Sequence, residues 1–267
     1  MTSLDLDLHG RTALVSGSTA GIGLAIAAGL AAHGARTIVN GRTPARVEGA
    51  LAEIRQNQAD ADVTGVAADL ATADGAATIV ERFPAVDILV NNLGIFEPTP
   101  FEQIGDADWL RFFETNVLSG VRLTRAYLGH MRTQGWGRVI FVSSESGLQI
   151  PAEMVHYGVT KTAQIALARG IAESVAETGI TVNSVLPGPT RSEGVATFVA
   201  QMAAQNGIGE DAMEKQFFAT ARPSSLLKRF ITPDEVANMV VYLCSPAASA
   251  TTGAAVRVDG GVVRAIA

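Results

Sequence analysis

Residues 12–23 read Thr-Ala-Leu-Val-Ser-Gly-Ser-Thr-Ala-Gly-Ile-Gly, and this stretch decides the fold. An apolar run typical of a buried strand is followed by glycines spaced G-x-x-x-G-x-G and then by an alanine-rich segment typical of a helix. Because glycine has no Cβ, such a loop lets a phosphate reach bare backbone N–H groups at the start of a helix. The order strand, loop, helix therefore predicts a dinucleotide-binding turn. Its predicted cofactor contacts are Gly17, Ser18, Thr19, Gly21, Ile22 and Gly23.

Outward from this turn, short β-rich runs alternate with longer helical stretches. The strand candidates are residues 12–16, 37–40, 63–67, 86–91, 139–143, 181–186 and 255–258. The helix candidates are residues 21–33, 44–56, 106–132 and 153–177, and a further helix begins at Pro233, which suits a first helical turn. The strand candidates are apolar at nearly every position, as strands covered on both faces are. The pattern predicts a single α/β domain over residues 1–267, a Rossmann-type, doubly wound parallel sheet of about seven strands with helices on both faces.

Composition and charge narrow the class of protein. Hydrophobic residues make up 48% and charged residues 17% of the 267 residues, which predicts a globular fold with a substantial core. The net charge of -6 and the absence of a basic run argue against nucleic acid and anionic membranes as partners. The sequence has neither a leader-like start nor an apolar run of about 18 residues, so we expect a cytoplasmic protein. Cys244 is the single cysteine, so we expect a small buried hydrophobe near a helix end and no cysteine-based metal cluster.

The residues that follow the second and third strands bear on cofactor choice. NAD enzymes usually place an acidic residue after the second strand to bind the ribose 2′-OH, whereas a cation meets the 2′-phosphate of NADP. This chain has Arg42 there and no Asp or Glu, which predicts a preference for NADP (NADPH) with NAD still possible. The alternative is that Arg42 is a solvated surface residue. Asp69, which closes the third strand, is a candidate adenine contact.

Residues 191–229 carry no strand and interrupt the alternation. Their position and length favour a substrate lid, and the alternative is two surface helices joined by a loop. Arg191, Arg222 and Arg229 in this region either meet an acidic substrate or are solvated.

Tyr157 and Lys161 are the first candidates for catalysis. In a helix they stand at i and i+4 and project from the same face. A free phenol titrates near about 10, and a nearby ammonium favours the phenolate and lowers that pKa. Tuned in this way, Tyr157 can give a proton to a carbonyl oxygen or take one from an alcohol. Ser144 ends the fifth strand thirteen residues earlier, and its hydroxyl is placed to bind the same oxygen.

With these residues, the sequence resembles the single-domain Rossmann-type branch of the short-chain dehydrogenase/reductase family, and in general form its 3-oxoacyl-carrier-protein reductases. The resemblance covers nearly the whole chain. The family marks are the glycine turn of residues 16–23, Asn91-Asn92-Leu93-Gly94, Asn116, Ser144, Tyr157 with Lys161, Pro187-Gly188 and Val258-Asp259-Gly260-Gly261. Two positions depart from the family pattern, Leu93 for alanine and Ser16 for threonine, and neither removes a polar group.

The resemblance implies a role for each catalytic residue in interconverting a carbonyl and a secondary alcohol. Tyr157 is the general acid/base, and Lys161 lowers its pKa and binds the nicotinamide ribose. Ser144 polarises the substrate oxygen, and Asn116 holds a water that links Lys161 to solvent. No metal is required.

The resemblance also implies further contacts and an assembly. Pro187 and Gly188 set the hydride face beside the nicotinamide, and Thr190 contacts its carboxamide. Asn92 and Gly94 complete the predicted cofactor-binding set, whereas Asn91 could instead brace the loop. A homotetramer or homodimer is implied as well.

Other residues near the site are left open. Glu145, Glu153 and His156 are close to Ser144 or Tyr157 in sequence, but Glu153 is better interpreted as part of a solvated first helical turn. His156 points about 100° away from Tyr157 in a helix and is not assigned to catalysis. The aromatic residues before Asn116 are interpreted as core or interface residues: Trp109, Phe112 and Phe113.

Two other functions compete with an oxidoreductase. Loss of the tyrosine or the lysine would favour a catalytically silent dinucleotide-binding regulator, but both residues are present. An epimerase or dehydratase that retains its cofactor usually needs an added sugar-nucleotide domain, for which the short tail after Gly261 leaves no room.

Overall fold

The computed structural model describes residues 4–266, and its seven strands form one sheet. In chain order they are β1 (Thr12–Val15), β2 (Arg36–Gly41), β3 (Val63–Ala67), β4 (Ile88–Asn91), β5 (Gly137–Val142), β6 (Ile180–Pro187) and β7 (Ala255–Val258). The spatial order is β3-β2-β1-β4-β5-β6-β7, and every neighbouring pair is parallel. The strand order reverses after β3, where the chain returns to place β4 beside β1. This confirms the doubly wound Rossmann-type sheet.

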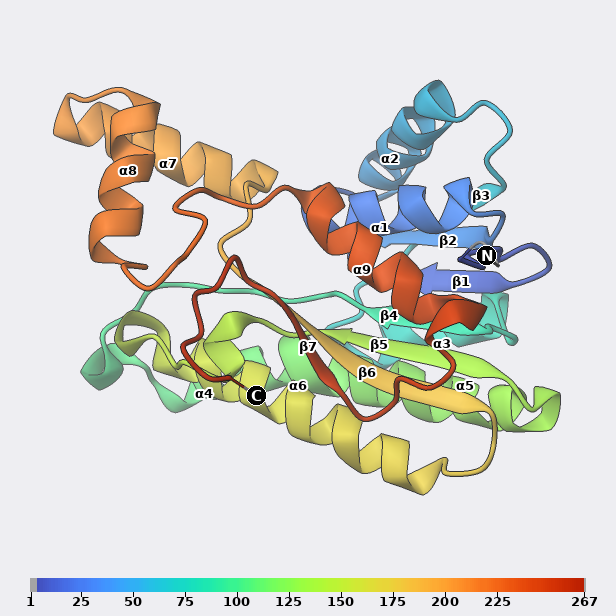
Figure 1. Ribbon diagram of the computed structural model, residues 1–267. Coiled ribbons are helices and arrows are strands. Elements are labelled where there is room, and N and C mark those ends of the chain that lie inside the picture. The colour runs from blue at the N-terminus through green and yellow to red at the C-terminus, as the bar shows by residue number, and fades with distance from the viewer. Residues whose placement is uncertain (1–3, 267) are drawn as a thin grey trace.

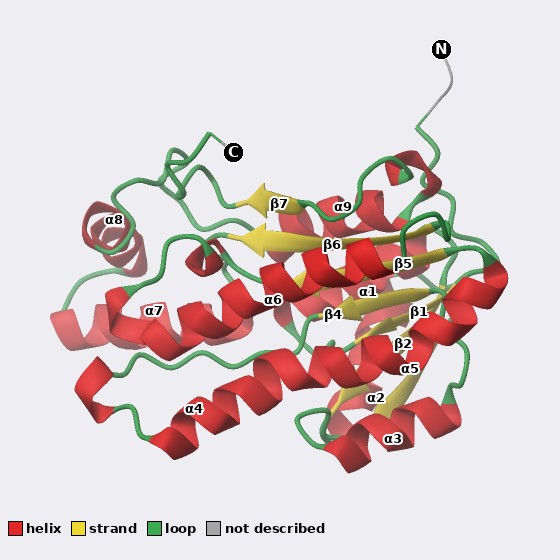
Figure 2. Cartoon of the chain, turned by 90° about the horizontal axis from the view of Figure 1, so that it is seen from below, coloured by secondary structure: helices red, strands yellow, loops and turns green. Residues whose placement is uncertain are grey.

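Helices connect the strands and cover both faces of the sheet (Figure 1). In chain order they are α1 (Gly21–Ala32), α2 (Pro44–Asn57), α3 (Ala73–Arg82), α4 (Asp106–Phe113), α5 (Ser119–Gln134), α6 (Val155–Ser174), α7 (Glu193–Asn206), α8 (Glu210–Thr220) and α9 (Pro233–Cys244). Helices α1, α2 and α9 lie on one face, and α3, α5 and α6 lie on the other (Figures 1 and 2). Each layer buries its own apolar core against the sheet. Cys244 is fully buried at the end of α9, as expected.

One predicted helix needs correction, and one helix was missed. The single helix expected over residues 106–132 is divided into α4 and α5 by a π turn, Glu114–Leu118, in which the Ser119 N–H donates to the Glu114 carbonyl. The spacing of hydrophobic residues does not reveal a π turn. A π turn adds one residue to a single helical turn, and the chain stays helical on both sides of it. Helix α3 was not anticipated, although Thr72 caps it and Ala76 and Ile79 bury one face.

Residues 191–229 contain two helices, α7 and α8, rather than irregular chain. They share a small core of their own that is separate from the cores at the sheet. Its buried members are Val199, Ala203, Met213, Phe218 and Phe230. The interpretation as two joined helices is therefore confirmed, whereas the lid function stays a prediction.

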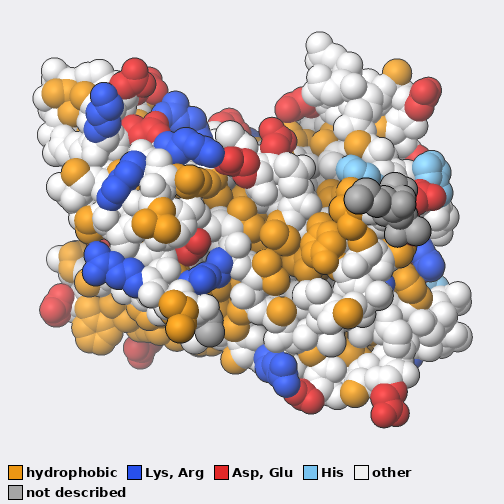
Figure 3. Space-filling model, viewed as in Figure 1, with side chains coloured by type: hydrophobic (Ala, Val, Ile, Leu, Met, Phe, Trp, Pro, Cys, Tyr) orange, Lys and Arg blue, Asp and Glu red, His pale blue; other side chains and the backbone are white. Residues whose placement is uncertain are grey.

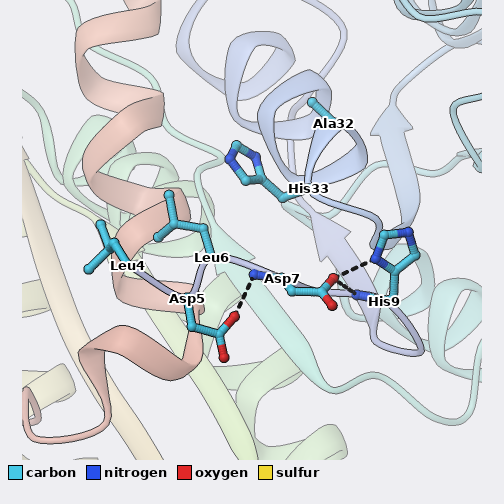
Figure 4. A pocket seen from close by; sticks show the side chains of 7 residues that line it. All are labelled: Leu4, Asp5, Leu6, Asp7, His9, Ala32 and His33. Carbon is cyan, nitrogen blue, oxygen red and sulfur yellow. Dashed lines mark hydrogen bonds and ion pairs between the residues drawn. The ribbon is translucent and has the colours of Figure 1, made fainter. Parts of the chain in front are cut away.

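A pocket near the N-terminus lies at the edge of the sheet opposite the carboxyl ends of the strands. Figure 4 shows its lining, which comes from the segment before β1 and the end of α1: Leu4, Asp5, Leu6, Asp7, His9, Ala32 and His33. The His9 ring bonds Asp7, and the backbone and side-chain hydrogen bonds from His9 lower the pKa of this exposed carboxyl. The pocket contains none of the predicted site residues. Among the residues that the structure describes, no helix is long and apolar enough to cross a membrane.

Candidate active site

The glycine turn between β1 and α1 has a conformation that requires its glycines. Gly17 and Gly21 have φ angles of 60° and 55°, in the left-handed region that residues with a Cβ rarely adopt. A Cβ on Gly23 would lie 2.4 Å from Asn92 Nδ2 and 2.5 Å from the Gly17 carbonyl oxygen. The backbone is therefore packed too closely at Gly23 for a side chain.

Asn92 and Ser16 fix this turn to the end of β4. Asn92 Nδ2 donates to the carbonyl oxygens of Ser16 (3.0 Å) and Gly17 (2.9 Å). The Ser16 hydroxyl accepts from the backbone N–H groups of Asn92 (2.9 Å) and Leu93 (3.0 Å). The two departures from the family pattern, Ser16 and Leu93, thus preserve the bracing. Asn92 acts on the turn through these bonds, and its direct contact with a cofactor stays a prediction.

The first turn of α1 offers free backbone donors to a ligand. Its N-cap is Ala20, no side chain among residues 4–266 caps it, and its first turn holds no acidic residue. The first N–H groups of a helix have no partner within the helix, and the N-terminus carries a positive partial charge. These donors and the bare glycine backbone fit the pyrophosphate of a dinucleotide.

Arg42 and Asp69 lie at the carboxyl ends of neighbouring strands. Arg42 is exposed directly after β2, and the preceding Gly41 packs so closely on the turn that its Cβ would lie 2.4 Å from Thr19 Cγ2. Asp69 follows β3, and its Oδ1 accepts from the Ala71 N–H (3.1 Å) in the loop before α3. The structure thus brings Arg42 beside the glycine turn.

The segment after β6 closes the same edge of the sheet. Gly188 donates its N–H to the Val258 carbonyl (2.9 Å), and a Cβ at Gly188 would lie 2.6 Å from the Asp259 carbonyl oxygen. The Thr190 hydroxyl donates to the Gly188 carbonyl (2.9 Å). Pro187, Gly188 and Thr190 therefore stand together where β6 ends.

Helix α7 begins against the glycine turn. A Cβ on Gly21 would lie 3.1 Å from Ser192 Cβ, and Arg46 of α2 pairs with Glu193 at 3.6 Å. A pocket of about 420 Å³ opens between α1, α2, α7 and the start of α9. Figure 3 shows the surface hollowed between the α7–α8 segment and α2. This hollow borders the predicted pyrophosphate site.

Ser144, Tyr157 and Lys161 come together at the carboxyl end of β5. Tyr157 and Lys161 are one turn apart in α6, and Lys161 Nζ lies 5.6 Å from the centroid of the Tyr157 ring. Ser144 is the N-cap of the 3-10 turn Glu145–Gly147. Burial raises the pKa of the Tyr157 phenol, and the neighbouring Ser144 side chain opposes that rise. Tyr157, the predicted acid/base, thus forms one cluster with Ser144 and Lys161.

Lys161 is buried, with 4% of its surface exposed. Its Nζ donates to the Val142 carbonyl (2.9 Å) and to Gln164 Oε1 (3.1 Å). Burial lowers the pKa of Lys161 from 10.5 to about 7. A Cβ on Gly94 would lie 3.3 Å from Nζ, so the loop after β4 closes over the ammonium. Gly94 and Lys161 are therefore adjacent.

Asn116 lies in the π turn and holds the loop after β4. Its Oδ1 accepts from the Ile95 N–H (2.8 Å), and its Nδ2 donates to the Ile95 carbonyl (3.0 Å) and the Thr160 hydroxyl (3.0 Å). These bonds join the π turn, the loop and α6 around Lys161. Asn91 likewise braces the interior, since its Nδ2 donates to Thr124 Oγ1 (3.1 Å). The water-holding role of Asn116 stays a prediction.

Glu145 is a buried acid beside the catalytic serine. Its Oε2 accepts from the Ser144 hydroxyl (2.5 Å), and its Oε1 accepts from Arg222 Nε (3.0 Å). Arg222 also pairs with Glu153 at 3.4 Å. Because Arg222 follows α8, the ion pair connects the 191–229 region to Ser144. The sequence placed Glu145 next to Ser144, but nothing in its motifs indicated this pairing or its burial.

The remaining candidates lie outside the cluster. The buried His156 ring packs on Phe112, with centroids 3.8 Å apart, and against Trp109, which agrees with a core role for these aromatic residues. Arg191 pairs with Glu214, and Arg229 with Glu235. No group of three or more His, Cys, Asp or Glu side chains in the described chain is placed to hold a metal ion.

A parallel sheet with an open helix N-terminus and a Ser-Tyr-Lys cluster at one edge defines a dinucleotide-binding oxidoreductase. A family model described as enoyl-(acyl carrier protein) reductase matches residues 17–263. The chain belongs to the short-chain dehydrogenase/reductase family, whose members are dehydrogenases and reductases.

Individual relatives match nearly the whole chain. It is 46% identical over 263 residues to the uncharacterized oxidoreductase YvaG of Bacillus subtilis, covering 98% of this chain and 100% of the relative. It is 32% identical over 263 residues to the 3-oxoacyl-[acyl-carrier-protein] reductase FabG of Aquifex aeolicus, covering 97% and 100%. The structure of L-sorbose reductase from Gluconobacter frateurii, complexed with NADPH and L-sorbose, is 31% identical with a TM-score of 0.90, covering 98% and 100%. The predicted resemblance is confirmed.

Proposed function

We propose that this protein is an NADPH-dependent oxidoreductase that interconverts a carbonyl and a secondary alcohol, with Tyr157 as the general acid/base. The observation that carries the proposal is the cluster of Ser144, Tyr157 and Lys161 beside an open helix N-terminus. When bound, the nicotinamide supplies or accepts the hydride. The residues of the chain position the substrate and manage the proton.

Each member of the cluster has one task. Tyr157 donates its phenolic proton to the carbonyl oxygen during reduction and takes a proton from the alcohol during oxidation. Lys161, when protonated, favours the phenolate and so lowers the barrier to this transfer. Ser144 donates to Glu145 in the structure, so its hydrogen turns toward the substrate when it binds a carbonyl oxygen. Asn116 supports Lys161 by holding the π turn, the loop after β4 and α6 together around it.

The proposed cofactor contacts come from residues at the carboxyl ends of the strands. The glycine turn binds the pyrophosphate, Asp69 the adenine, and Arg42 the 2′-phosphate of NADP, so NAD binds more weakly. Lys161 and Gly94 would hold the nicotinamide ribose. Pro187, Gly188 and Thr190 would hold the nicotinamide. The NADPH bound to L-sorbose reductase supports this assignment.

We propose an uncharged small-molecule substrate. Arg191, Arg222 and Arg229 are each paired with a glutamate, so none is free to bind a substrate carboxylate. Around Ser144, the carboxylates of Glu145 and Glu153 outnumber the single guanidinium of Arg222, which disfavours an anion. The neutral sugar bound in L-sorbose reductase agrees with this charge class.

We also propose that the chain assembles as a homotetramer or homodimer and acts in the cytoplasm, two properties that the family resemblance and the sequence suggested. Sedimentation velocity at micromolar concentration tests the assembly. A single species with the mass of one chain, 27.7 kDa, would contradict it.

Replacing the acid/base tests the proposed reaction. Tyr157→Phe removes the hydroxyl, and we expect turnover with NADPH to fall about 10²–10⁴-fold while NADPH binding is retained. Tyr242→Phe, in α9, removes a hydroxyl outside the site and serves as the matched control. Undiminished turnover in Tyr157→Phe would overturn the mechanism. NADPH binding without turnover of any carbonyl by the unmodified protein would instead favour the catalytically silent regulator.

A further inference from the structure

Gln164 is a buried polar side chain with no task in the reaction described above. It lies in α6 three residues after Lys161, so the two side chains share one helix face. Only 1% of its surface is exposed. Gln164 Oε1 accepts from Lys161 Nζ (3.1 Å), and Gln164 Nε2 donates to the carbonyl oxygen of Asn116 (2.5 Å). The amide therefore links the ammonium to the π turn.

The two partners fix the orientation of this amide. A lysine ammonium has only donors and a backbone carbonyl has only lone pairs. The opposite orientation would place the amide nitrogen against Lys161 Nζ and the amide oxygen against the Asn116 carbonyl, two repulsive contacts. Gln164 Oε1 must therefore face Lys161.

Two of the three donors of the ammonium are bound to fixed acceptors. The Val142 carbonyl and Gln164 Oε1 take two of the three N–H groups of Lys161. The third is free of these two acceptors, and the centroid of the Tyr157 ring lies 5.6 Å from Nζ. An ammonium held by two fixed acceptors loses the rotational freedom that a long lysine side chain otherwise has.

We propose that Gln164 is a positioning residue that keeps Lys161 protonated and directed toward Tyr157 by anchoring it to the carbonyl of Asn116. This inference rests on the proposed function and deepens it. An amide oxygen that accepts from the charged form of an amine stabilises that form. Gln164 does not titrate, so it holds the proton on Lys161 without relaying it.

Few groups around Lys161 can keep its ammonium protonated. Burial is the cause that lowers the pKa of Lys161 to about 7, and no carboxylate of the described chain counteracts it. Tyr157 is the titratable neighbour on α6, and the charges of Glu145 and Arg222 lie beyond it. In the described chain, β5 places the Val142 carbonyl against the ammonium, and the loop after β4 and the π turn place Gly94 and Asn116 beside it, none of which titrates.

A direct titration of Lys161 tests the inference without turnover. The chain has only three lysines, Lys161, Lys215 and Lys228, so [13Cε]lysine NMR resolves Lys161, with Lys161→Met to assign its signal. In Gln164→Met, which keeps the size and removes the acceptor, we expect the Lys161 midpoint to fall by about one pH unit. In Gln164→Glu, which places a carboxylate beside the ammonium, we expect it to rise by about one unit or more.

Opposite shifts in the two variants would exclude a merely structural role, because packing alone does not move a titration in both directions. Gln58→Met is the matched control. Gln58 lies at the end of α2 and its amide donates to the Ala28 carbonyl of α1, so this substitution should leave the Lys161 midpoint unchanged. Circular dichroism checks that each variant is folded, and either folded variant by itself decides the sign of the effect. A Lys161 midpoint equal to that of the unmodified protein in the folded variants would overturn the inference.

Kinetics separate this inference from the proposed function. In the unmodified protein, kcat/KM should fall at alkaline pH, where Lys161 loses its proton. The pH of this fall should be lower in Gln164→Met and higher in Gln164→Glu. If Tyr157→Phe is inactive but both Gln164 variants keep the normal profile and midpoint, the proposed function stands and the inference fails. If Tyr157→Phe is fully active, the proposed function fails.

Discussion

Replacing Gly23 with alanine tests whether the glycine turn is a preorganised pyrophosphate site. Gly23 lies in the first turn of α1, where alanine is otherwise the better helix former by about 1 kcal/mol. In this structure the added Cβ would lie 2.4 Å from Asn92 Nδ2, 2.5 Å from the Gly17 carbonyl oxygen and 2.9 Å from Ser18 Cα. Two of these three atoms belong to the backbone, which cannot turn aside as the end of a side chain can.

The structure sets the size of the effect. Forcing a methyl group into a packed site costs about 1–3 kcal/mol. Separating Asn92 Nδ2 from the Gly17 carbonyl, now 2.9 Å apart, costs about another 1 kcal/mol. After subtracting the gain in helix propensity, we expect Gly23→Ala to lower the free energy of unfolding by about 1–3 kcal/mol. Because the displaced atoms line the pyrophosphate site, NADPH affinity should fall about tenfold or more.

Urea denaturation and NADPH fluorescence titration measure the two effects. Gly49→Ala is the matched control, because Gly49 lies inside α2 with open space where its Cβ would be. It should raise the stability by up to about 1 kcal/mol and leave NADPH binding unchanged. A Gly23→Ala protein with unchanged unfolding midpoint and unchanged NADPH affinity would refute the reasoning.

Three further predictions concern charged side chains. Arg42→Ala should weaken NADPH binding about 10–100-fold and leave NADH binding nearly unchanged, and an equal loss for both cofactors in titrations would contradict the 2′-phosphate contact. Arg222→Met leaves the buried Glu145 without its cation and should lower the free energy of unfolding by about 3 kcal/mol, and an unchanged urea midpoint would contradict this expectation. The lowered pKa of Lys161 means that the unfolded chain binds more protons between pH about 7 and 10.5, so stability should rise with pH across this window. Lys161→Met should lack that rise. If the stability of Lys161→Met and of the unmodified protein changed with pH in parallel, the lowered pKa of Lys161 would be contradicted.

The strands were predictable because their signal is local. Buried parallel strands are apolar on both faces, so short runs such as residues 139–143, which overlap β5, stand out from the amphipathic helices around them. The π turn Glu114–Leu118 was not predictable, because it changes the hydrogen-bond ladder and not the polarity of the sequence. Helix α3 carried a signal in its Thr72 cap and in Ala76 and Ile79, which are three residues apart. Its apolar face is short, so the helix was missed.

The candidate site was predictable where its residues share one element or one motif. Tyr157 and Lys161 stand one turn apart in a helix, so their neighbourhood follows from the sequence. Pairings between distant segments were not: Arg222 meets Glu145 across 77 positions, and Gln164 meets Asn116 across 48. Such contacts depend on how α6, the π turn and the segment after α8 pack together.

Hydride transfer itself is the most direct test of the central claim. The purified protein would be incubated with NADPH deuterated at C4 of the nicotinamide and with a panel of uncharged ketones and hydroxyketones, and the products analysed by mass spectrometry. We predict an alcohol that carries one deuterium on the former carbonyl carbon, formed at least about 10²-fold more slowly by Tyr157→Phe. NADPH binding without deuterated alcohol from any substrate would contradict the claim.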